Sequence, residues 1–216
     1  MGVTSTSLTD LVLVRHAQAE HNVAGRHALM SGWADLPLTA CGTAQAERLA
    51  RWLQHELRAA AVYTSPSERA RHTALPIVRR LAVELRIESD LREIHCGDAD
   101  GRSIAEVRER YPREWAANDA QQDPNFRWPG GESYREFRER VLGVVERIAA
   151  AHRGERVVLV THTGVISQLM GHYAGLSPAR WARFRPRNAS ITELRWSEQR
   201  LQVLGFDRLP DGCQAA

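Results

Sequence analysis

The feature that most constrains the fold is the regular alternation of short apolar runs with longer amphipathic segments. The runs "LVLV" (Leu11–Val14) and "RVVLVTH" (156–162) have the length and composition of buried strands. The segment at 39–58 has helical spacing of its apolar residues, with Thr39 as its N-cap. Strands that alternate with helices of this length predict an α/β fold, a three-layer α/β/α sandwich with a mostly parallel central sheet.

The same patterns predict the remaining elements. Further strands are expected at 60–65 and 83–89, and a closing strand pair at 188–196 and 200–206. Further helices are expected from about Pro66, at 103–111, at 133–152 and at 164–175. Pro76 is expected to kink or end the helix that starts near Pro66, and Pro112 to stop the helix at 103–111. Residues 118–131 are expected to form a loop. Because no repeat or linker interrupts the pattern, residues 1–216 are expected to form a single domain with frayed tails at 1–9 and 208–216.

The composition argues against several classes of protein. No apolar run approaches the ~18 residues of a membrane span, and the first ten residues lack the basic and apolar regions of a signal peptide. Cys41, Cys96 and Cys213 show no CxxC spacing, which indicates free thiols in a reducing cytoplasm rather than disulfides or a zinc site. All 29 basic residues are arginines interleaved with acids, so neither nucleic acid nor a membrane is expected as a partner.

Polar residues suited to binding an anion follow three of the predicted strands. Arg15 and His16 follow the first strand, and His162 and Thr163 follow the strand near the C-terminus. Arg69 lies one helical turn into the segment after the second strand. Ligands bind outside the carboxyl ends of the strands in such sheets, so these side chains are expected to converge at one edge. Two cations, two imidazoles and nearby helix N-termini are typical of a phosphate site.

The motifs that the chain lacks narrow the chemistry of that site. It contains no GxxxxGK[ST] loop, no GxGxxG, no HExxH and no cluster of Asp pairs, so neither a metal nor an organic cofactor is expected. Phosphate chemistry without a metal needs a nucleophile from the protein, and a neutral imidazole qualifies. Arg15 disfavours the imidazolium form of the adjacent His16, which keeps His16 unprotonated near neutral pH.

Five segments carry a family resemblance: "RHAQAEHN", "YTSPSERARHTA", "LREIHCGDADGRS", "PGGES" and "VTHTGV". In order and spacing they resemble the signature of the histidine phosphatase superfamily, phosphoglycerate-mutase-like branch (branch 1), over about residues 11–190. The resemblance implies that His16 attacks phosphorus and becomes a phosphohistidine. It also implies that Arg15, Arg69 and His162 bind the phosphoryl oxygens and stabilise the charge of the transition state.

The same resemblance assigns supporting roles to other residues. It implies that Asn22 and Thr163 contribute to binding of the phosphoryl group or the substrate. Glu93 would protonate the leaving oxygen and then accept a proton from the attacking water, which requires a raised carboxyl pKa. Glu132 would order the site from behind these residues.

The chain departs from the family signature at three places. Ala17 replaces the glycine that usually follows the catalytic histidine, and Ala19 replaces a hydroxyl residue. The segment "GDADG" stands where "GxWEG" is usual. Cys96 nearby is expected to be a buried, inert thiol. The remaining histidines are expected to be structural or surface residues: His21, His27, His55, His72, His95, His152 and His172.

Two enzymatic outcomes share this chemistry, and a third alternative is non-catalytic. A phosphatase lets water reach the phosphohistidine, whereas a mutase excludes water and returns the phosphoryl group to a sugar acid. The segment "NVAGRHALMSGWADLPLT" resembles the mutase branch, but the basic "ERHYG"-like segment of that branch is missing. A metal-independent phosphatase is therefore predicted. A weakened member that binds phosphoesters without turnover stays as the third alternative.

The substrate stays open beyond a small phosphorylated metabolite, with inorganic phosphate as the other expected ligand. The loop after Asn22 and a lid between about Ser103 and Gly131 are expected to set specificity. A homodimer through the closing strand pair is also left open. The specificity residues in the loop would be Arg26, Met30 and Trp33. Two alternatives stay open for the substrate: a second anionic group would be met by Arg102, Arg108 and Arg113, and an apolar group would be covered by Trp115, Phe126 and Trp128.

Overall fold

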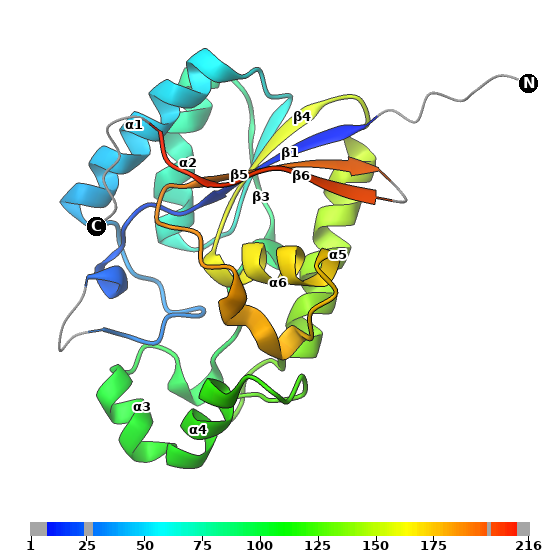
Figure 1. The fold of residues 1–216 in the computed structure, drawn as a ribbon. Coiled ribbons are helices and arrows are strands. Elements are labelled where there is room, and N and C mark those ends of the chain that lie inside the picture. Colours follow the sequence, from blue (N-terminus) through cyan, green and yellow to red (C-terminus); the bar gives the residue numbers. More distant parts are fainter. Residues whose placement is uncertain (1–7, 24–27, 198–199, 211–216) are drawn as a thin grey trace, which may run out of the picture.

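The computed structural model describes residues 8–23, 28–197 and 200–210 (Figure 1). The described residues form one six-stranded sheet with the strand order β3-β2-β4-β1-β5-β6. Four neighbouring strands run parallel, and β5 and β6 are antiparallel to their neighbours, which confirms the mostly parallel sheet. The strands are β1 (Thr9–Arg15), β2 (Ala61–Thr64), β3 (Leu85–Ile87), β4 (Arg156–Thr161), β5 (Ile191–Ser197) and β6 (Arg200–Arg208).

Helices cover both faces of the sheet, as the expected three-layer sandwich requires (Figure 1). α1 (Ala40–Glu56) and α2 (Glu68–Leu81) pack on one face. α5 (Tyr134–Ala151) and α6 (Thr163–Tyr173) pack on the other. Successive side chains of a strand point to opposite faces, so Leu11 and Leu13 join the core under α5 while Val12 and Val14 join the core under α1. A strand buried on both faces has to be apolar throughout, and this explains the run "LVLV".

The predicted helix starts are confirmed at two places. The hydroxyl of Thr39 accepts a hydrogen bond from the backbone N–H of Gly42, at the first turn of α1. Ser133 caps α5 in the same way, because its hydroxyl accepts from the N–H of Glu136. The carboxylate of Glu136 in turn accepts from the N–H of Ser133, which completes a capping box.

The two prolines compare differently with the predictions. α2 continues beyond Pro76 to Leu81, so the prediction that Pro76 ends this helix is wrong. The neighbouring residues Ala74 and Ile77 pack in the core with α1 and the sheet, and the proline removes only one hydrogen bond from the helix. α3 (Ile104–Arg110) ends before Pro112, as predicted, and Pro112 then begins a new helix, α4 (Pro112–Ala120), where its missing N–H costs nothing. The first residues of the expected loop at 118–131 are therefore helical.

The segment from α3 to the start of α5 forms a lid, away from the main sheet (Figure 1). Its apolar side chains pack in a small core that also includes Cys96, Ala99 and Ala179. Aromatic side chains dominate this core: the ring centroids of Phe126 and Trp128 lie 5.4 Å apart, and so do those of Phe126 and Tyr134. Trp115 packs against the cluster from α4. The lid is thus a packed unit that joins the main domain through the start of α5.

The ordered sheet reaches into both segments that were expected to fray. β1 begins at Thr9, whose buried hydroxyl donates to the carbonyl oxygen of Ala149, and β6 extends to Arg208. A single domain over 1–216 stays a prediction. Within the described ranges, the structure contains no helix with the length and hydropathy of a transmembrane span.

Candidate active site

The carboxyl ends of β1, β2 and β4 bring the predicted residues to one edge of the sheet. Arg15 is the last residue of β1 and pairs in register with Thr161, the last residue of β4. The next residues, His16 and His162, lie side by side with their ring centroids 5.2 Å apart. Arg69 enters from α2, directly after β2. Segments about 50 and 100 residues apart in the sequence thus meet because the parallel register aligns their strand ends.

His16 is held in the form that a nucleophile requires. Its side chain is only 3% exposed, and Nδ1 lies 2.8 Å from the carbonyl oxygen of Ala17. A carbonyl oxygen only accepts, so Nδ1 carries the proton and Nε2 keeps its lone pair. Burial lowers the pKa of His16 well below its usual value, and the nearby charges of Arg69 and Arg15 lower it further. His16 is therefore neutral near neutral pH.

The backbone around His16 is fixed by two side chains from distant segments. The amide group of Asn188 donates from Nδ2 to the carbonyl oxygen of His16 at 3.0 Å. The hydroxyl of Thr73 in α2 accepts from the N–H of Ala17 at 3.0 Å. Ala17 is completely buried, so its methyl group occupies packed space where the family usually has glycine.

One ring nitrogen of His162, the neighbour of His16, has no hydrogen-bond partner among the described residues. Its Nε2 lies 2.9 Å from the hydroxyl oxygen of Ser65, whereas its buried Nδ1 has no hydrogen-bond partner within the described ranges. Burial lowers the pKa of His162 well below its usual value, with Arg69 contributing next. An unpaired buried polar atom is costly, so Nδ1 is a group to which a ligand can bind.

His21 is a residue that sequence reasoning missed. It was expected to be structural or exposed, but its ring lies 5.5 Å from that of His16. Its Nδ1 is buried without a partner among the described residues, and burial lowers its pKa to about 3, with Arg69 and Arg15 contributing. His27 lies outside the described residues. Only the short spacing from His16 marks His21 in the sequence, and His21 lies in the 3-10 helix at Glu20–Asn22.

Arg69 is a buried cation and Arg15 is a partly buried one, and neither has an anionic partner among the described residues. Arg69 is completely buried, and its guanidinium group donates to the carbonyl oxygens of Gly32 and Ala34, each at 2.8 Å. Arg15 donates to the carbonyl oxygen of Pro186 at 2.8 Å. In the described part of the chain no carboxylate lies within ion-pair distance of either residue, and the Nε atom of each has no partner.

Both guanidinium groups nevertheless remain charged at neutral pH. Burial lowers the pKa of Arg15 to about 10, and the negative charge of Glu93 opposes this shift. Burial also lowers the pKa of Arg69, and Glu93, Asp100 and Asp35 oppose it. Two positive charges, one buried and one partly buried, that keep free donors define a site for an anion with several oxygens.

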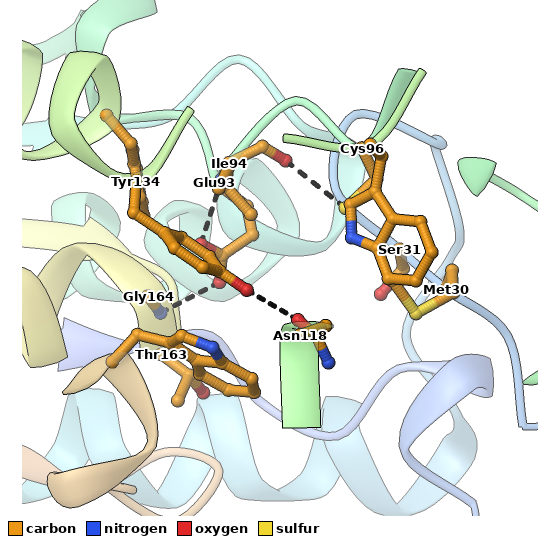
Figure 2. Close-up of a pocket in the computed structure, with 12 residues that line it drawn as sticks. Met30, Ser31, Glu93, Ile94, Cys96, Asn118, Tyr134, Thr163 and Gly164 are labelled. Carbon is orange, nitrogen blue, oxygen red and sulfur yellow. Dashed lines mark hydrogen bonds between the residues drawn. The ribbon is translucent and has the colours of Figure 1, made fainter. Parts of the chain in front are cut away.

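The carboxylate of Glu93 is held by two backbone N–H groups (Figure 2). Oε2 accepts from Gly164 at 2.8 Å, and Oε1 accepts from Ile94 at 2.9 Å. Burial raises the pKa of Glu93, and the two N–H groups and both arginines only partly offset this effect. A Cβ atom at position 164 would lie 2.0 Å from Oε1 of Glu93, so only glycine leaves room for the carboxylate.

Glu132 acts on Glu93 through a residue that sequence reasoning missed. The carboxylate of Glu132 accepts from Nε and Nη2 of Arg140 in α5, at 2.9 and 2.7 Å. The same guanidinium group donates to the carbonyl oxygens of Asp90, Arg92 and Glu93 at 2.7, 3.0 and 3.2 Å. Arg140 thus clamps the backbone that leads into Glu93, and Glu132 orients Arg140. Among 29 arginines, no sequence signal distinguishes Arg140.

Asn22 and Thr163 lie at the same edge of the sheet. Oδ1 of Asn22 accepts from the N–H of Ala19 at 3.1 Å and from Nδ2 of Asn188 at 3.0 Å. Its Nδ2 is therefore the group left to donate. Thr163 is the first residue of α6 and lines the pocket beside Glu93.

The altered segment "GDADG" contains an aspartate that orients the residues bound to Arg69. The carboxylate of Asp100 accepts from the N–H groups of Gly32, Trp33 and Ala34 at 2.8, 2.6 and 3.1 Å. The carbonyl oxygens of Gly32 and Ala34 are the groups that hold Arg69. Asp100 therefore fixes the turn that orients Arg69. Within the described residues, no group of three or more His, Cys, Asp or Glu is placed to hold a metal ion.

This combination of sheet order and strand-end residues defines a protein of the phosphoglycerate-mutase-like α/β class. A solved structure of mycobacterial glucosyl-3-phosphoglycerate phosphatase superposes with a TM-score of 0.80 and 28% identity, covering 93% of this chain and 99% of that one. A sequence model of the histidine phosphatase superfamily (branch 1) matches residues 11–208. The chain belongs to this superfamily.

Relatives with assigned names include phosphatases and a mutase-like protein. The chain is 37% identical to the metal-independent phosphoserine phosphatase of Arabidopsis thaliana, over 74% of this chain and 67% of the relative. It is 32% identical to phosphoserine phosphatase 1 of Hydrogenobacter thermophilus, over 91% of each chain. It is also 34% identical to phosphoglycerate mutase-like protein 4 of Arabidopsis thaliana, over 74% of this chain and 69% of the relative.

Proposed function

We propose that this protein is a metal-independent phosphatase that hydrolyses a small phosphorylated metabolite through a phosphohistidine on His16. The observation that carries the proposal is the pairing of a neutral His16, whose Nε2 lone pair is free, with two guanidinium groups, one buried and one partly buried, that have no anionic partner among the described residues. A phosphoryl group supplies the missing negative charge, and its oxygens accept from the free donors. Phosphatases among the relatives support the same activity.

The first half-reaction transfers the phosphoryl group to the protein. Nε2 of His16 forms a bond to phosphorus as the bond from phosphorus to the ester oxygen breaks. Arg15, Arg69 and His162 bind the three phosphoryl oxygens, and Nδ2 of Asn22 and the hydroxyl of Thr163 add donors at the rim. Glu93 acts here in its protonated form, which burial favours by raising its pKa, and it gives its proton to the leaving alcohol oxygen.

The second half-reaction returns the protein to its starting state. Water attacks phosphorus, the bond to Nε2 of His16 breaks, and the carboxylate of Glu93 takes the proton from water. Inorganic phosphate leaves, and His16 and Glu93 regain their initial protonation. Glu132 and Arg140 serve both halves by holding the backbone at Glu93, and neither residue exchanges a proton with substrate.

Phosphate release in the presence of EDTA tests this proposal. The panel contains phosphoserine, 3-phosphoglycerate, sugar phosphates and aryl phosphates, assayed with wild type, His16→Ala and His55→Ala. His55 is an exposed histidine on α1 and serves as the matched control. We expect turnover that survives EDTA, disappears in His16→Ala and persists in His55→Ala, together with an acid-labile phosphoryl group on His16 in quenched wild-type samples.

Other results would separate the alternatives. Transfer of the phosphoryl group between positions of a sugar acid, faster than phosphate release, would indicate a mutase. Tight phosphate binding without turnover would indicate a binding protein, and loss of activity in EDTA would contradict metal independence. We also propose a cytoplasmic location without nucleic acid or membrane partners, and a homodimer formed through β5 and β6. Gel filtration with light scattering tests the dimer.

A further inference from the structure

The candidate site opens into a pocket of about 160 Å³ that starts at Glu93 and Gly164 (Figure 2). The pocket lies where the alcohol part of a phosphoester would sit, since Glu93 would protonate that oxygen. A cavity of roughly 150 Å³ holds one benzene ring. The residues that line the pocket come from the loop before α1, the loop after β3, the lid, α5, α6 and the turn after α6: Met30, Ser31, Glu93, Ile94, Cys96, Asn118, Trp128, Tyr134, Phe137, Thr163, Gly164 and Trp181.

The walls of this pocket are aromatic and rigid. Trp128, Tyr134 and Phe137 are 3%, 4% and 1% exposed, so each is packed from behind as well as facing the pocket. The ring of Phe126 lies 5.4 Å from that of Trp128 and supports it from within the lid core. Well-packed aromatic walls favour a flat or branched apolar group over a hydrated one.

Glu93 is the only charged residue among the described residues that line the pocket. The arginines expected to meet a second anion are placed elsewhere. The Arg108 guanidinium group stacks on Trp115, with its carbon 4.5 Å from the ring centroid, and Arg102 donates to the carbonyl oxygen of Asp98 at 2.6 Å. Arg113 is exposed on α4. None of these three arginines lines the pocket beside Glu93.

The polar groups at the far end of the pocket are uncharged. The hydroxyl of Tyr134 donates to Oδ1 of Asn118 at 2.5 Å, which leaves Nδ2 of Asn118 as a donor (Figure 2). The buried indole N–H of Trp181 interacts with the hydroxyl of Tyr134. The free Nδ2 of Asn118 suits one carbonyl, amide or hydroxyl group on an otherwise apolar ligand.

We propose that the leaving group is an uncharged alcohol with an aromatic or branched aliphatic body, rather than a carboxylate-bearing alcohol such as serine or glycerate. This inference rests on the proposed phosphatase function. A carboxylate in the pocket would be desolvated against aromatic rings beside the carboxylate that Glu93 becomes after it gives up its proton. The step is otherwise unchanged: the ester oxygen leaves phosphorus and takes the proton of Glu93.

Three alkyl phosphates test the inference, and two of them, the carboxylate and the amide, differ mainly in charge. Benzyl phosphate and 4-carboxybenzyl phosphate have similar leaving-group chemistry, and 4-carbamoylbenzyl phosphate is the neutral counterpart with nearly the same shape. We expect kcat/KM for benzyl phosphate to exceed that for 4-carboxybenzyl phosphate by at least about 100-fold, because no counter-ion accompanies the buried charge. The amide should be hydrolysed within about 10-fold of benzyl phosphate, and phosphoserine and 3-phosphoglycerate should follow the carboxylate.

A variant of Met30 tests whether the lack of a positive charge in the pocket is the reason that carboxylated esters react slowly. Met30 lines the pocket and is partly exposed, so it tolerates a longer polar side chain. Met30→Arg should raise kcat/KM for 4-carboxybenzyl phosphate about 10-fold relative to benzyl phosphate, whereas Met30→Gln, with the same reach and no charge, should leave the ratio unchanged. Arg26→Ala is included because residue 26 lies outside the described structure, and it should also leave the ratio unchanged.

The outcomes distinguish this inference from the function on which it rests. Turnover that requires His16 but is equal or faster for the carboxylated esters would overturn the apolar pocket and leave the phosphatase intact. A preference for carboxylated esters that disappears in Arg26→Ala would overturn it as well, and would show that residue 26 supplies the charge. No turnover of any ester that depends on His16 would overturn both proposals.

Discussion

The backbone N–H of Gly164 donates a hydrogen bond of 2.8 Å to Oε2 of Glu93, and a methyl group at position 164 would lie 2.0 Å from the other carboxylate oxygen. The first turn of α6, which follows His162 in the chain, therefore also holds Glu93, the proposed general acid. One helix start thus positions residues on both sides of the proposed phosphoryl site.

Gly164→Ala should lower kcat/KM by about 100-fold, the loss that a displacement of about 1 Å causes at a reacting group. The clash displaces Glu93 rather than the buried helix, because the carboxylate is the movable partner. Steady-state kinetics on benzyl phosphate measures the loss. Gly143→Ala in α5 is the matched control, since no atom lies within 4 Å of its added methyl group. It should keep activity and stabilise the fold by about 0.5–1 kcal/mol. An active Gly164→Ala would contradict the positioning.

The pH profile should report the raised pKa of Glu93. The first step needs Glu93 protonated, so activity on alkyl phosphates should fall as pH rises through the raised pKa. His16 has a pKa well below its usual value, so it stays neutral until the pH is strongly acidic. Glu93→Gln should lower kcat by about 10²–10⁴-fold on benzyl phosphate and remove the basic limb.

The role of Glu93 can also be tested by comparing the effect of Glu93→Gln on benzyl phosphate with its effect on an ester that has a better leaving group. Phosphoryl transfer from 4-nitrophenyl phosphate needs no proton, so formation of the phosphohistidine should be much less affected by Glu93→Gln with this substrate. Rapid-quench measurement of the phosphoryl burst provides the readout. An equal loss of burst rate with both esters would argue that Glu93 has a structural role only.

Arg140→Lys should reduce kcat about 10-fold with little change in KM, less than the ~100-fold cost of a 1 Å displacement. A lysine cannot donate to Glu132 and to three backbone carbonyls in the planar arrangement of a guanidinium group. The basic limb of the pH profile should shift because Glu93 moves. Arg147→Lys is the control, since Arg147 lies on the same helix with a 55% exposed side chain. An unchanged profile in Arg140→Lys would refute this positioning role.

Arg69→Met should abolish activity yet raise the thermal stability of the unliganded protein. Arg69 is a completely buried cation without an ion-pair partner among the described residues, and replacing such a charge by an apolar side chain is often stabilising by about 1–4 kcal/mol. Differential scanning calorimetry checks the shift. Arg79→Met, at an exposed site on α2, should change neither property.

Inorganic phosphate should make wild type more stable than Arg69→Met, the opposite of the order expected without ligand. At about 100 times its Kd, phosphate stabilises a folded protein by ~2.7 kcal/mol, and the variant without Arg69 should lose most of this gain. If phosphate stabilises wild type and Arg69→Met equally, Arg69 does not bind the phosphoryl group.

The sequence alone predicted the features that depend on local pattern. Apolar runs predicted β1, β2 and β4, and their carboxyl ends predicted the meeting of His16, His162 and Arg69, because parallel strands place these ends at one edge. The order and spacing of five segments predicted the family. Patterns of this kind survive in the sequence because strand burial and helix capping are determined by residues close together in the chain.

Tertiary structure alone decided which of many similar residues matter. Arg140, Asn188 and Asp100 reach their partners across 47, 172 and 68 positions of the chain, and nothing local marks them. Pro76 remains inside a helix because the packing of α2 on its neighbours outweighs one missing hydrogen bond. The pocket beside Glu93 likewise exists only where the lid, α6 and the loop before α1 meet, so its apolar character depends on side chains brought together by folding.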